Sequence, residues 1–396
     1  MQKPLRILTI VNLPWDPRLG AARVYVDLAE QWKKAGHVVE KFCLTNAFPK
    51  PANSRGLRAL RQVLFPRRAA RFVRQHAAEF EVIDALIGAL PFHKSNLRFA
   101  GLIVARSVGL HRAYDQFGRF SQEKWPDQPR GKFLGRIFYR WMRRRLLRDD
   151  ESSLRHCDLI NLINEDEIQF LRHPPAIDKP AMVEPNGLTE KESAAFAGAM
   201  ESPEKRLRAK EICFVGMWGL RKGSRDWPEL VRRIRQGMPE ARFNFLGTMT
   251  DDETVVNDLR LASADGVRIL SMFDREQLPR FLSPCGVGLF PSYIEGFGLA
   301  VLEQLACGIP TIAYDVSGPR QILRSLAATL LVPAGDTAAM AERALKILRL
   351  DVHEYATLSA ECRSIAERFR WEQIAADTID KYQAALEKTT NAPACK

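Results

Sequence analysis

One segment in the second half of the chain predicts a strand, a turn, a helix and a strand in succession, and this order restricts the possible folds. Residues 286–290 predict a short buried strand, and a turn with the sequence Gly-Phe-Gly follows. The next residues predict a helix that stops at Gly308, because glycine favours the conformation that ends a helix and Pro310 prevents continuation. Residues 311–314 predict the second strand. This unit is typical of a parallel sheet, where ligands bind at the carboxyl ends of the strands.

Two carboxylates, Glu295 and Glu303, flank that glycine turn. The amides of the turn and of the helix N-terminus offer N–H groups to an anion, and a carboxylate inside the helix accepts hydrogen bonds from two neighbouring hydroxyls. Taken singly, the glycines fit any tight turn, and Glu303 fits a solvated helix position. Taken together, these residues predict a site for an anionic, hydroxyl-rich ligand.

A second loop follows the strand predicted over residues 211–216. Lys222 stands six residues after Gly216 and directly before Gly223. An isolated Arg-Lys-Gly run is more often a solvated, flexible loop. If this loop belongs to a site, a fixed ammonium group would stabilise the negative charge that grows on a departing diphosphate.

The run from Phe290 to Ile322 resembles the E-x7-E signature of retaining GT-B glycosyltransferases of family four, which use nucleotide-sugar donors. The resemblance covers nearly the whole chain and is strongest over residues 183–375. It implies an α/β fold of the GT-B type, in which two Rossmann-like domains face each other across a cleft. We expect an N-terminal acceptor domain over 1–185, a donor-binding domain over 186–375, and a C-terminal helix over 376–396 that packs back toward the first domain.

The resemblance also implies roles for single positions. Glu295 would contact the donor sugar, Glu303 the nucleotide ribose, and Lys222 the donor diphosphate. The catalytic candidates are Lys222, Glu295 and His111. The donor-binding candidates are Gly20, Gly216, Arg221, Lys222, Glu295, Gly296, Phe297, Gly298, Leu299 and Glu303. We expect neither a cofactor nor a metal ion, since in this family lysine, arginine and helix N-termini neutralise the diphosphate.

Some positions depart from the family pattern. Met217 stands where many members have an arginine, and Arg221 would take over part of that role. Val108 stands where many members have a histidine. His111, three residues later, either substitutes for it or is an ordinary surface histidine. Two acidic runs, 149–151 and 251–253, predict capped helix starts rather than metal ligands.

The positive charge is concentrated in one part of the chain. Residues 51–150 carry 21 Lys and Arg against 8 Asp and Glu, which accounts for the whole net charge of +12. This block contains two predicted helices, 57–75 and 133–148, in which arginines alternate with aromatic and aliphatic residues. Such helices suit either an anionic membrane surface, which we favour for residues 54–75 and 133–148, or a solvated face. No motif predicts nucleic-acid binding.

Other features bear on location and on domain structure. The seven cysteines are scattered without C-x-x-C spacing, which favours free thiols in a reducing compartment. No segment resembles a signal peptide or a transmembrane helix. We therefore expect a cytoplasmic protein, peripheral at the cytoplasmic membrane face. The charged stretch 189–210 predicts a linker between the domains.

These observations predict a retaining glycosyltransferase with a glycan or lipid-linked acceptor, in the synthesis of bacterial cell-surface polysaccharide or lipopolysaccharide. Two other classes remain open. The GT-B fold also serves nucleotide-sugar epimerases and phosphorylases, although a glycogen-type phosphorylase would need a longer chain and a pyridoxal lysine. The departures at Val108 and Met217 keep open a catalytically silent subunit that binds a membrane or a partner. Neither the sugar nor the acceptor follows from the pattern.

Overall fold

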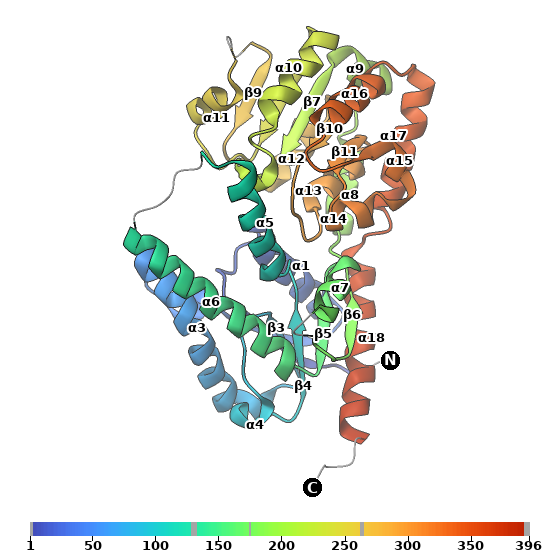
Figure 1. Cartoon of the computed structure of the whole chain (residues 1–396). Coiled ribbons are helices and arrows are strands. Elements are labelled where there is room, and N and C mark those ends of the chain that lie inside the picture. Colours follow the sequence, from blue (N-terminus) through green and yellow to red (C-terminus); the bar gives the residue numbers. More distant parts are fainter. Residues whose placement is uncertain (1–2, 128–132, 174–175, 262–264, 392–396) are drawn as a thin grey trace. The chain divides into compact units, whose positions relative to one another are not determined.

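The computed structural model describes residues 3–127, 133–173, 176–261 and 265–391; the side chains at positions 133, 134, 136 and 139 of helix α6 and at positions 389–391 of helix α18 lie outside this description. The chain forms two compact units (Figure 1). Unit 1 comprises Met1–Asn186 and Trp371–Lys396, and unit 2 comprises Gly187–Arg370. The final helix begins at Trp371, five residues before the boundary expected from the sequence.

Unit 1 is built on a parallel sheet in the strand order β2-β1-β3-β4-β5-β6. Its strands are β1 (Arg6–Val11), β2 (Val38–Cys43), β3 (Val82–Leu86), β4 (Leu102–Arg106), β5 (Leu159–Leu162) and β6 (Ala181–Val183). Every residue of β3, β4 and β5 is buried, because helices cover both faces of the sheet. The sequence predicts strands near residues 5–11, 37–42, 82–85, 102–105 and 157–163, and the structure has a strand at each of these places; the short edge strand β6 was not predicted.

The helices of unit 1 divide between the two faces of the sheet. Apolar side chains of α18 and most of those of α1 share one core cluster with the strands, and those of α3, α6 and α7 belong to the other, together with Tyr25 of α1. The helices are α1 (Gly20–Lys34), α2 (Leu44–Ala47), α3 (Arg55–His76), α4 (Lys94–Leu97), α5 (His111–Lys124), α6 (Phe133–His156), α7 (Asp166–Arg172) and α18 (Trp371–Asn391), with the 3-10 turn η1 (Ala77–Glu79).

Unit 2 repeats this plan with a second parallel sheet, in the order β12-β11-β10-β7-β8-β9. The strands are β7 (Glu211–Val215), β8 (Arg242–Leu246), β9 (Val267–Leu270), β10 (Cys285–Phe290), β11 (Thr311–Tyr314) and β12 (Leu331–Val332). The helices are α8 (Glu190–Gly198), α9 (Pro203–Ala209), α10 (Trp227–Gly237), α11 (Asp252–Leu259), α12 (Leu278–Leu282), α13 (Leu299–Ala306), α14 (Ser317–Ile322), α15 (Ala327–Leu330), α16 (Thr337–Leu348) and α17 (Val352–Ala366). The 3-10 turns are η2 (Leu220–Lys222), η3 (Arg275–Gln277) and η4 (Arg324–Leu326).

The expectation of a linker over 189–210 was wrong, because this stretch forms helices α8 and α9. Thr189 and Glu192 form a capping box at the start of α8, and the Ser202 side chain caps α9 just before Pro203. These are ordinary helix-start signals. The segment was predicted to be a loop because its many charged residues leave only a weak apolar periodicity.

The expectation of a capped helix start was confirmed for the acidic run 251–253 and was wrong for the run 149–151. Asp251 caps α11 by accepting a hydrogen bond from the amide of Thr254 at 2.8 Å, as expected. Asp149 and Asp150, however, lie inside α6, and both are buried. The helix continues past residue 148 to His156 because residues 149–156 are compatible with helix and Leu154 joins the apolar core.

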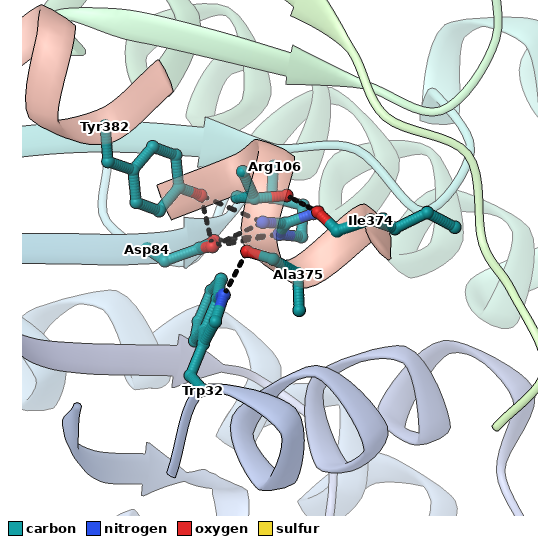
Figure 2. A network of polar contacts seen from close by, with 7 residues as sticks. Trp32, Asp84, Arg106, Ile374, Ala375 and Tyr382 are labelled. Carbon is teal, nitrogen blue, oxygen red and sulfur yellow. Dashed lines mark hydrogen bonds and ion pairs between the residues drawn. The ribbon is translucent and has the colours of Figure 1, made fainter. Parts of the chain in front are cut away.

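Helix α18 is anchored to the unit 1 sheet through a buried polar network (Figure 2). The Arg106 guanidinium donates to the Asp84 carboxylate at 2.7–3.1 Å, and both side chains are almost fully buried. The Tyr382 hydroxyl donates to Asp84 Oδ2 at 2.6 Å and lies 2.8 Å from an Arg106 nitrogen. The Trp32 indole N–H of α1 donates to the carbonyl of Ala375 at 3.2 Å. Strands β3 and β4 are thereby tied to a helix almost 300 residues away in sequence.

This network explains how two opposite charges are accommodated in the core. An unpaired buried carboxylate or guanidinium is strongly destabilising, whereas the bidentate pair and the tyrosine satisfy most of the polar atoms here. The last helix therefore supplies part of the compensation for charges that lie on the first sheet.

Among the described residues, no helix is both long enough and apolar enough to cross a membrane.

We predict that Tyr382→Phe lowers the free energy of unfolding by about 1–3 kcal/mol, because it leaves buried charged groups short of a hydrogen bond. Tyr25→Phe is the matched control, since the buried Tyr25 hydroxyl has no hydrogen-bond partner among the described residues. Urea denaturation monitored by circular dichroism measures both. Equal losses for the two variants would contradict the role assigned to Tyr382.

Candidate functional site

The turn between β10 and α13 carries the first acidic candidate. Glu295 lies in this turn with its side chain 16% exposed. Gly298 has a φ of +99° at the N-cap of α13, a left-handed conformation that favours glycine. Leu299 is the first residue of the helix, so its N–H belongs to the group that has no carbonyl acceptor within the helix. The carboxyl end of β10 therefore presents an acid beside a helix N-terminus.

Glu303 lies within α13 and is only 5% exposed. Its neighbours Val301, Leu302 and Leu305 are fully buried, so α13 has little contact with solvent on most of its surface. A solvated helix position, the ordinary interpretation of Glu303, does not fit this burial. A buried carboxylate requires hydrogen-bond donors around it.

The second loop follows β7, the strand next to β10 in the sheet. Gly216 directly follows the strand with a φ of +147° and lies beside Lys222, whose Cε would be 3.7 Å from a side-chain carbon built at residue 216. The loop then turns through η2, which contains Arg221 and Lys222. Because adjacent parallel strands end at one edge of the sheet, this loop and the β10–α13 turn meet there.

An ion cluster joins the two loops. Lys222 Nζ and Arg221 Nη1 both pair with Glu295 Oε2, the arginine at 3.2 Å. Arg221 also donates to the carbonyl of Ile294 at 3.2 Å, and Lys222 Nζ lies 4.4 Å from the centre of the Phe290 ring. We define the cluster as Arg221, Lys222 and Glu295. It holds two cations and one carboxylate.

The protonation equilibria of the cluster reflect burial and mutual charge. Burial favours the neutral form of Glu295, but the charges of Lys222 and then Arg221 outweigh it and hold the pKa of this carboxyl below its ordinary value. Burial lowers the pKa of the Lys222 ammonium; Glu295 opposes that shift and Arg221 adds to it. The carboxyl is therefore ionised at neutral pH.

A second contact between the loops involves residues that the sequence analysis missed. Asp226 Oδ2 accepts hydrogen bonds from the hydroxyls of Tyr293 at 2.7 Å and Tyr314 at 2.6 Å. The Tyr293 amide also donates to the carbonyl of Arg221 at 2.9 Å. Burial and then the contact with Asp226 raise the pKa of Tyr293 well above its usual range, so it remains a donor. Tyr293 flanks Glu295 in sequence, but nothing local links it to Asp226.

Two glycines permit the close packing around this turn. Gly223 has a φ of +77°, and a side-chain carbon there would lie 2.3 Å from the carbonyl oxygen of Pro291. A side-chain carbon at Gly318, in α14, would lie 2.2 Å from the carbonyl oxygen of Phe297. The backbone thus approaches both sides of the β10–α13 turn, and no larger residue fits at either position.

The other candidates take different places. Phe297 is buried and packs against Phe369 at 5.5 Å between ring centres, so its side chain belongs to the interior of unit 2. Gly296 is also buried in the turn. Met217, at the position of the family arginine, is 52% exposed. Gly20 and His111 lie in unit 1, at the first residues of α1 and α5, respectively.

His111 is held by a partner that the sequence did not suggest. Its Nδ1 lies 2.8 Å from Asp150 Oδ2 on α6, and this hydrogen bond raises the pKa of His111 above its ordinary value. The side chain is 49% exposed. His111 is thus a surface histidine whose ring is oriented by a buried carboxylate, and its part in catalysis stays a prediction.

We predict that Gly223→Ala disrupts the β10–α13 turn, because the added methyl group would collide with Pro291 and the left-handed backbone is unfavourable for alanine. A loss of stability of at least about 1 kcal/mol is expected in thermal unfolding. Gly219→Ala in the same loop is the control, since no atom lies within 4 Å of the added carbon. Wild-type stability of Gly223→Ala would contradict the assignment.

Comparisons with known proteins agree with this architecture. Residues 209–350, which contain both loops of the site, match the family described as Glycosyl transferases group 1. The D-inositol 3-phosphate glycosyltransferase of Xylanimonas cellulosilytica is 29% identical over 237 residues, covering 58% of this chain and 55% of the relative. The chain thus spans about half the length of the curated relatives it matches.

Solved structures show the same fold at low sequence identity. HepE of Anabaena, solved with UDP and glucose, superposes with a TM-score of 0.67 at 16% identity, covering 96% of this chain and 99% of that one. WaaG, a glycosyltransferase involved in lipopolysaccharide biosynthesis, gives 0.68 at 14% identity, covering 95% and 99%. The two parallel sheets are those of the GT-B fold, and residues 209–350 within unit 2 belong with the group 1 glycosyl transferases.

Proposed function

We propose that this protein is a retaining glycosyltransferase that moves a sugar from a nucleotide-diphosphate-sugar to a glycan or lipid-linked acceptor. The cluster of Arg221, Lys222 and Glu295 carries the proposal. Two cations against one carboxylate leave one positive charge in a half-buried place beside the N-terminus of α13. Limited solvent access strengthens the attraction of such a place for a diphosphate.

Each candidate has a role in the transfer. Lys222 and the first amides of α13 stabilise the charge that develops on the leaving diphosphate. Glu295 orients the donor sugar, and Arg221 and Lys222 orient Glu295. The buried carboxylate of Glu303 accepts hydrogen bonds from the ribose hydroxyls. The binding of UDP and glucose by HepE, a protein of the same fold, supports a nucleotide-sugar as the donor.

The acceptor is a sugar or polyol hydroxyl of a cell-surface glycan or its lipid-linked precursor. Two relatives support this class of acceptor. WaaG acts in lipopolysaccharide biosynthesis, and the curated relatives are named for a polyol phosphate, inositol 3-phosphate. We place the reaction at the cytoplasmic face of the membrane.

An exposed apolar patch on α6 supports attachment to a membrane surface. Ile137, Phe138 and Trp141 are 52%, 44% and 51% exposed, and the rings of Phe138 and Trp141 lie 6.0 Å apart. Exposed large apolar side chains are uncommon and usually mark a contact surface. Arg140 and Arg144 are exposed on the same helix, so the patch combines apolar and cationic groups. This combination suits an anionic lipid interface.

Helix α3 packs beside α6 and adds further positive charge to this part of unit 1. Leu57 and Leu60 are exposed near its start. Some of its arginines are already engaged: Arg74 donates to the carbonyl of Asn96 at 3.2 Å, and Arg68 donates to the carbonyl of Ala47. The membrane proposal therefore rests more on α6 than on α3.

We predict that Lys222→Ala lowers kcat by about 10²–10³, because a donor to the developing charge is lost. Glu303→Ala should instead raise the donor KM by about tenfold to a hundredfold, since the hydrogen bonds of a charged group are lost. Turnover of UDP-, GDP- and ADP-sugars measures both effects. Lys346→Ala, on an unrelated helix of unit 2, is the control.

The same assay separates the alternative functions. A nucleotide-sugar epimerase would convert the sugar of the donor without transferring it to an acceptor or to water. A silent subunit would leave every donor unchanged. Near-normal kinetics in both variants would overturn the assignment of the site, even if the wild-type protein is active.

We predict that the wild-type protein floats with vesicles rich in phosphatidylglycerol at low salt and dissociates at high salt, because surface charge attraction is screened. Replacing Ile137, Phe138 and Trp141 by serine should abolish flotation. Val352→Ser, which removes an exposed apolar side chain from unit 2, is the control. Absence of wild-type binding at low salt would refute membrane attachment.

A further inference from the structure

Asp226 links the carboxyl ends of three neighbouring strands of unit 2. It lies directly before α10, in the segment that follows β7, and it is 8% exposed. Its Oδ2 atom accepts hydrogen bonds from Tyr293, which follows β10, and from Tyr314, the last residue of β11. These strands are neighbours in the order β11-β10-β7. One carboxylate oxygen therefore connects three segments that are far apart in the sequence.

The side chain of Asp226 is not used in the way that its position on the helix suggests. An aspartate at the N-cap of a helix usually accepts a hydrogen bond from a backbone amide of the first turn. Asp226 occupies the N-cap of α10, but its side chain caps no amide there. The carboxylate is bonded to the two tyrosine hydroxyls instead. A local contact has thus been replaced by a contact between distant segments.

The backbone around Asp226 is firmly anchored. Trp227, the next residue, is 1% exposed and packs against Phe214 of β7 and Phe245 of β8, with ring centres 5.5 Å and 4.7 Å away. The Asp226 amide donates to the carbonyl of Gly223 at 2.9 Å. The carboxylate is therefore held at a fixed place, and it fixes the two tyrosines in turn.

This contact reaches the cluster of Arg221, Lys222 and Glu295 from both sides. The carbonyl that accepts from the Asp226 amide belongs to the residue directly after Lys222. Tyr293 stands two residues before Glu295, and its amide donates to the carbonyl of Arg221 at 2.9 Å. Asp226 thus lies between the loop that carries the two cations and the turn that carries their carboxylate.

The influence of Asp226 on the cluster is geometric. Burial, the charge of the partner and Arg221 set the pKa values of Lys222 and Glu295, both below their ordinary values. The reacting groups of an enzyme have to be held to within a fraction of an ångström, and a displacement of about 1 Å can cost about a hundredfold in rate. A rigid support behind the cluster therefore matters to any reaction that the cluster performs.

We propose that Asp226 is a positioning residue, which holds Lys222 against Glu295 by fastening the η2 loop to the β10–α13 turn through Tyr293 and Tyr314. Asp226 contacts no substrate in this role and acts only through the two loops. The effect on turnover rests on the proposed glycosyltransferase function, whereas the placement of Lys222 does not.

The first test measures the placement of Lys222 without any reaction of a donor. Formaldehyde with a borohydride methylates accessible lysines, and mass spectrometry of the peptides gives the rate at Lys222. The side chain is 12% exposed and paired with Glu295, so its methylation in the wild-type protein should be slow. Asp226→Leu should raise the rate at least about tenfold, because the loop opens more often. Asp226→Asn, which keeps an oxygen that can accept from both hydroxyls, should restore most of the protection.

Tyr355→Phe is the matched control for a general loss of stability. The buried Tyr355 hydroxyl donates to the carbonyl of Gly286 at 2.8 Å, at the opposite end of β10 from the turn. Thermal unfolding should show similar losses for Tyr355→Phe and Tyr314→Phe, since each removes one buried hydroxyl and keeps the ring. Only Tyr314→Phe should speed the methylation of Lys222. Equal methylation rates in these two variants would overturn the positioning role.

The second test follows the turnover of nucleotide-sugar donors. Asp226→Leu should lower kcat by about tenfold to a hundredfold. Asp226→Asn and Tyr355→Phe should stay near the wild-type value. In a Lys222→Ala background, Asp226→Leu should add little to the loss, because the group that Asp226 places is already absent. Fully additive losses would show that Asp226 does not act through Lys222.

The outcomes distinguish this inference from the proposed function. Unchanged methylation of Lys222 in Asp226→Leu would overturn the positioning role, even if the wild-type protein is an active transferase. Wild-type turnover by Asp226→Leu in an active protein would do the same. If the wild-type protein turns over no donor, the proposed function fails, and faster methylation of Lys222 in Asp226→Leu still supports the placement of Lys222 by Asp226.

Discussion

The carboxylate of Glu295 pairs with both Lys222 and Arg221. This contact keeps the three charged side chains of the candidate site together in unit 2. Without the two cations, burial would favour the neutral acid. Without the carboxylate, a lysine and an arginine would stand together in a half-buried place. Each group thus depends on the others, and the remaining positive charge defines the kind of ligand that the site attracts.

The polypeptide around the cluster is arranged to keep this contact in place. Asp226 ties Tyr293 to Tyr314, and Gly223 and Gly318 let two backbone segments approach the turn. Unit 1 also contains a buried carboxylate that accepts a hydrogen bond from a tyrosine hydroxyl. There, Asp84 and Arg106 are satisfied by Tyr382 of the last helix, so a buried ion pair fastens the end of the chain to the first sheet. Both units therefore hold buried charge through tyrosine hydroxyls.

Much of the fold could be predicted because parallel strands are buried on both faces and appear as short apolar runs. The strands missed were β6 and β12, which lie at sheet edges and are only three and two residues long. Helices α8 and α9 were missed because charge masked their caps. Of the site, the E-x7-E acids and Lys222 were predicted from motifs. Asp226, Tyr314 and Asp150 were not, because each acts on a residue far away in the chain.

By itself, the sequence determined the class of fold and the motifs of the candidate site, since local patterning and short spacings encode strands, turns and the charges they carry. Only the tertiary structure decided which of these charges meet. It placed Glu303 in a buried environment, joined Lys222 and Arg221 to one carboxylate, and turned His111 from a single histidine into a pair with Asp150. Such contacts depend on the packing of elements that are distant in sequence, and side-chain packing of this kind has no local signature.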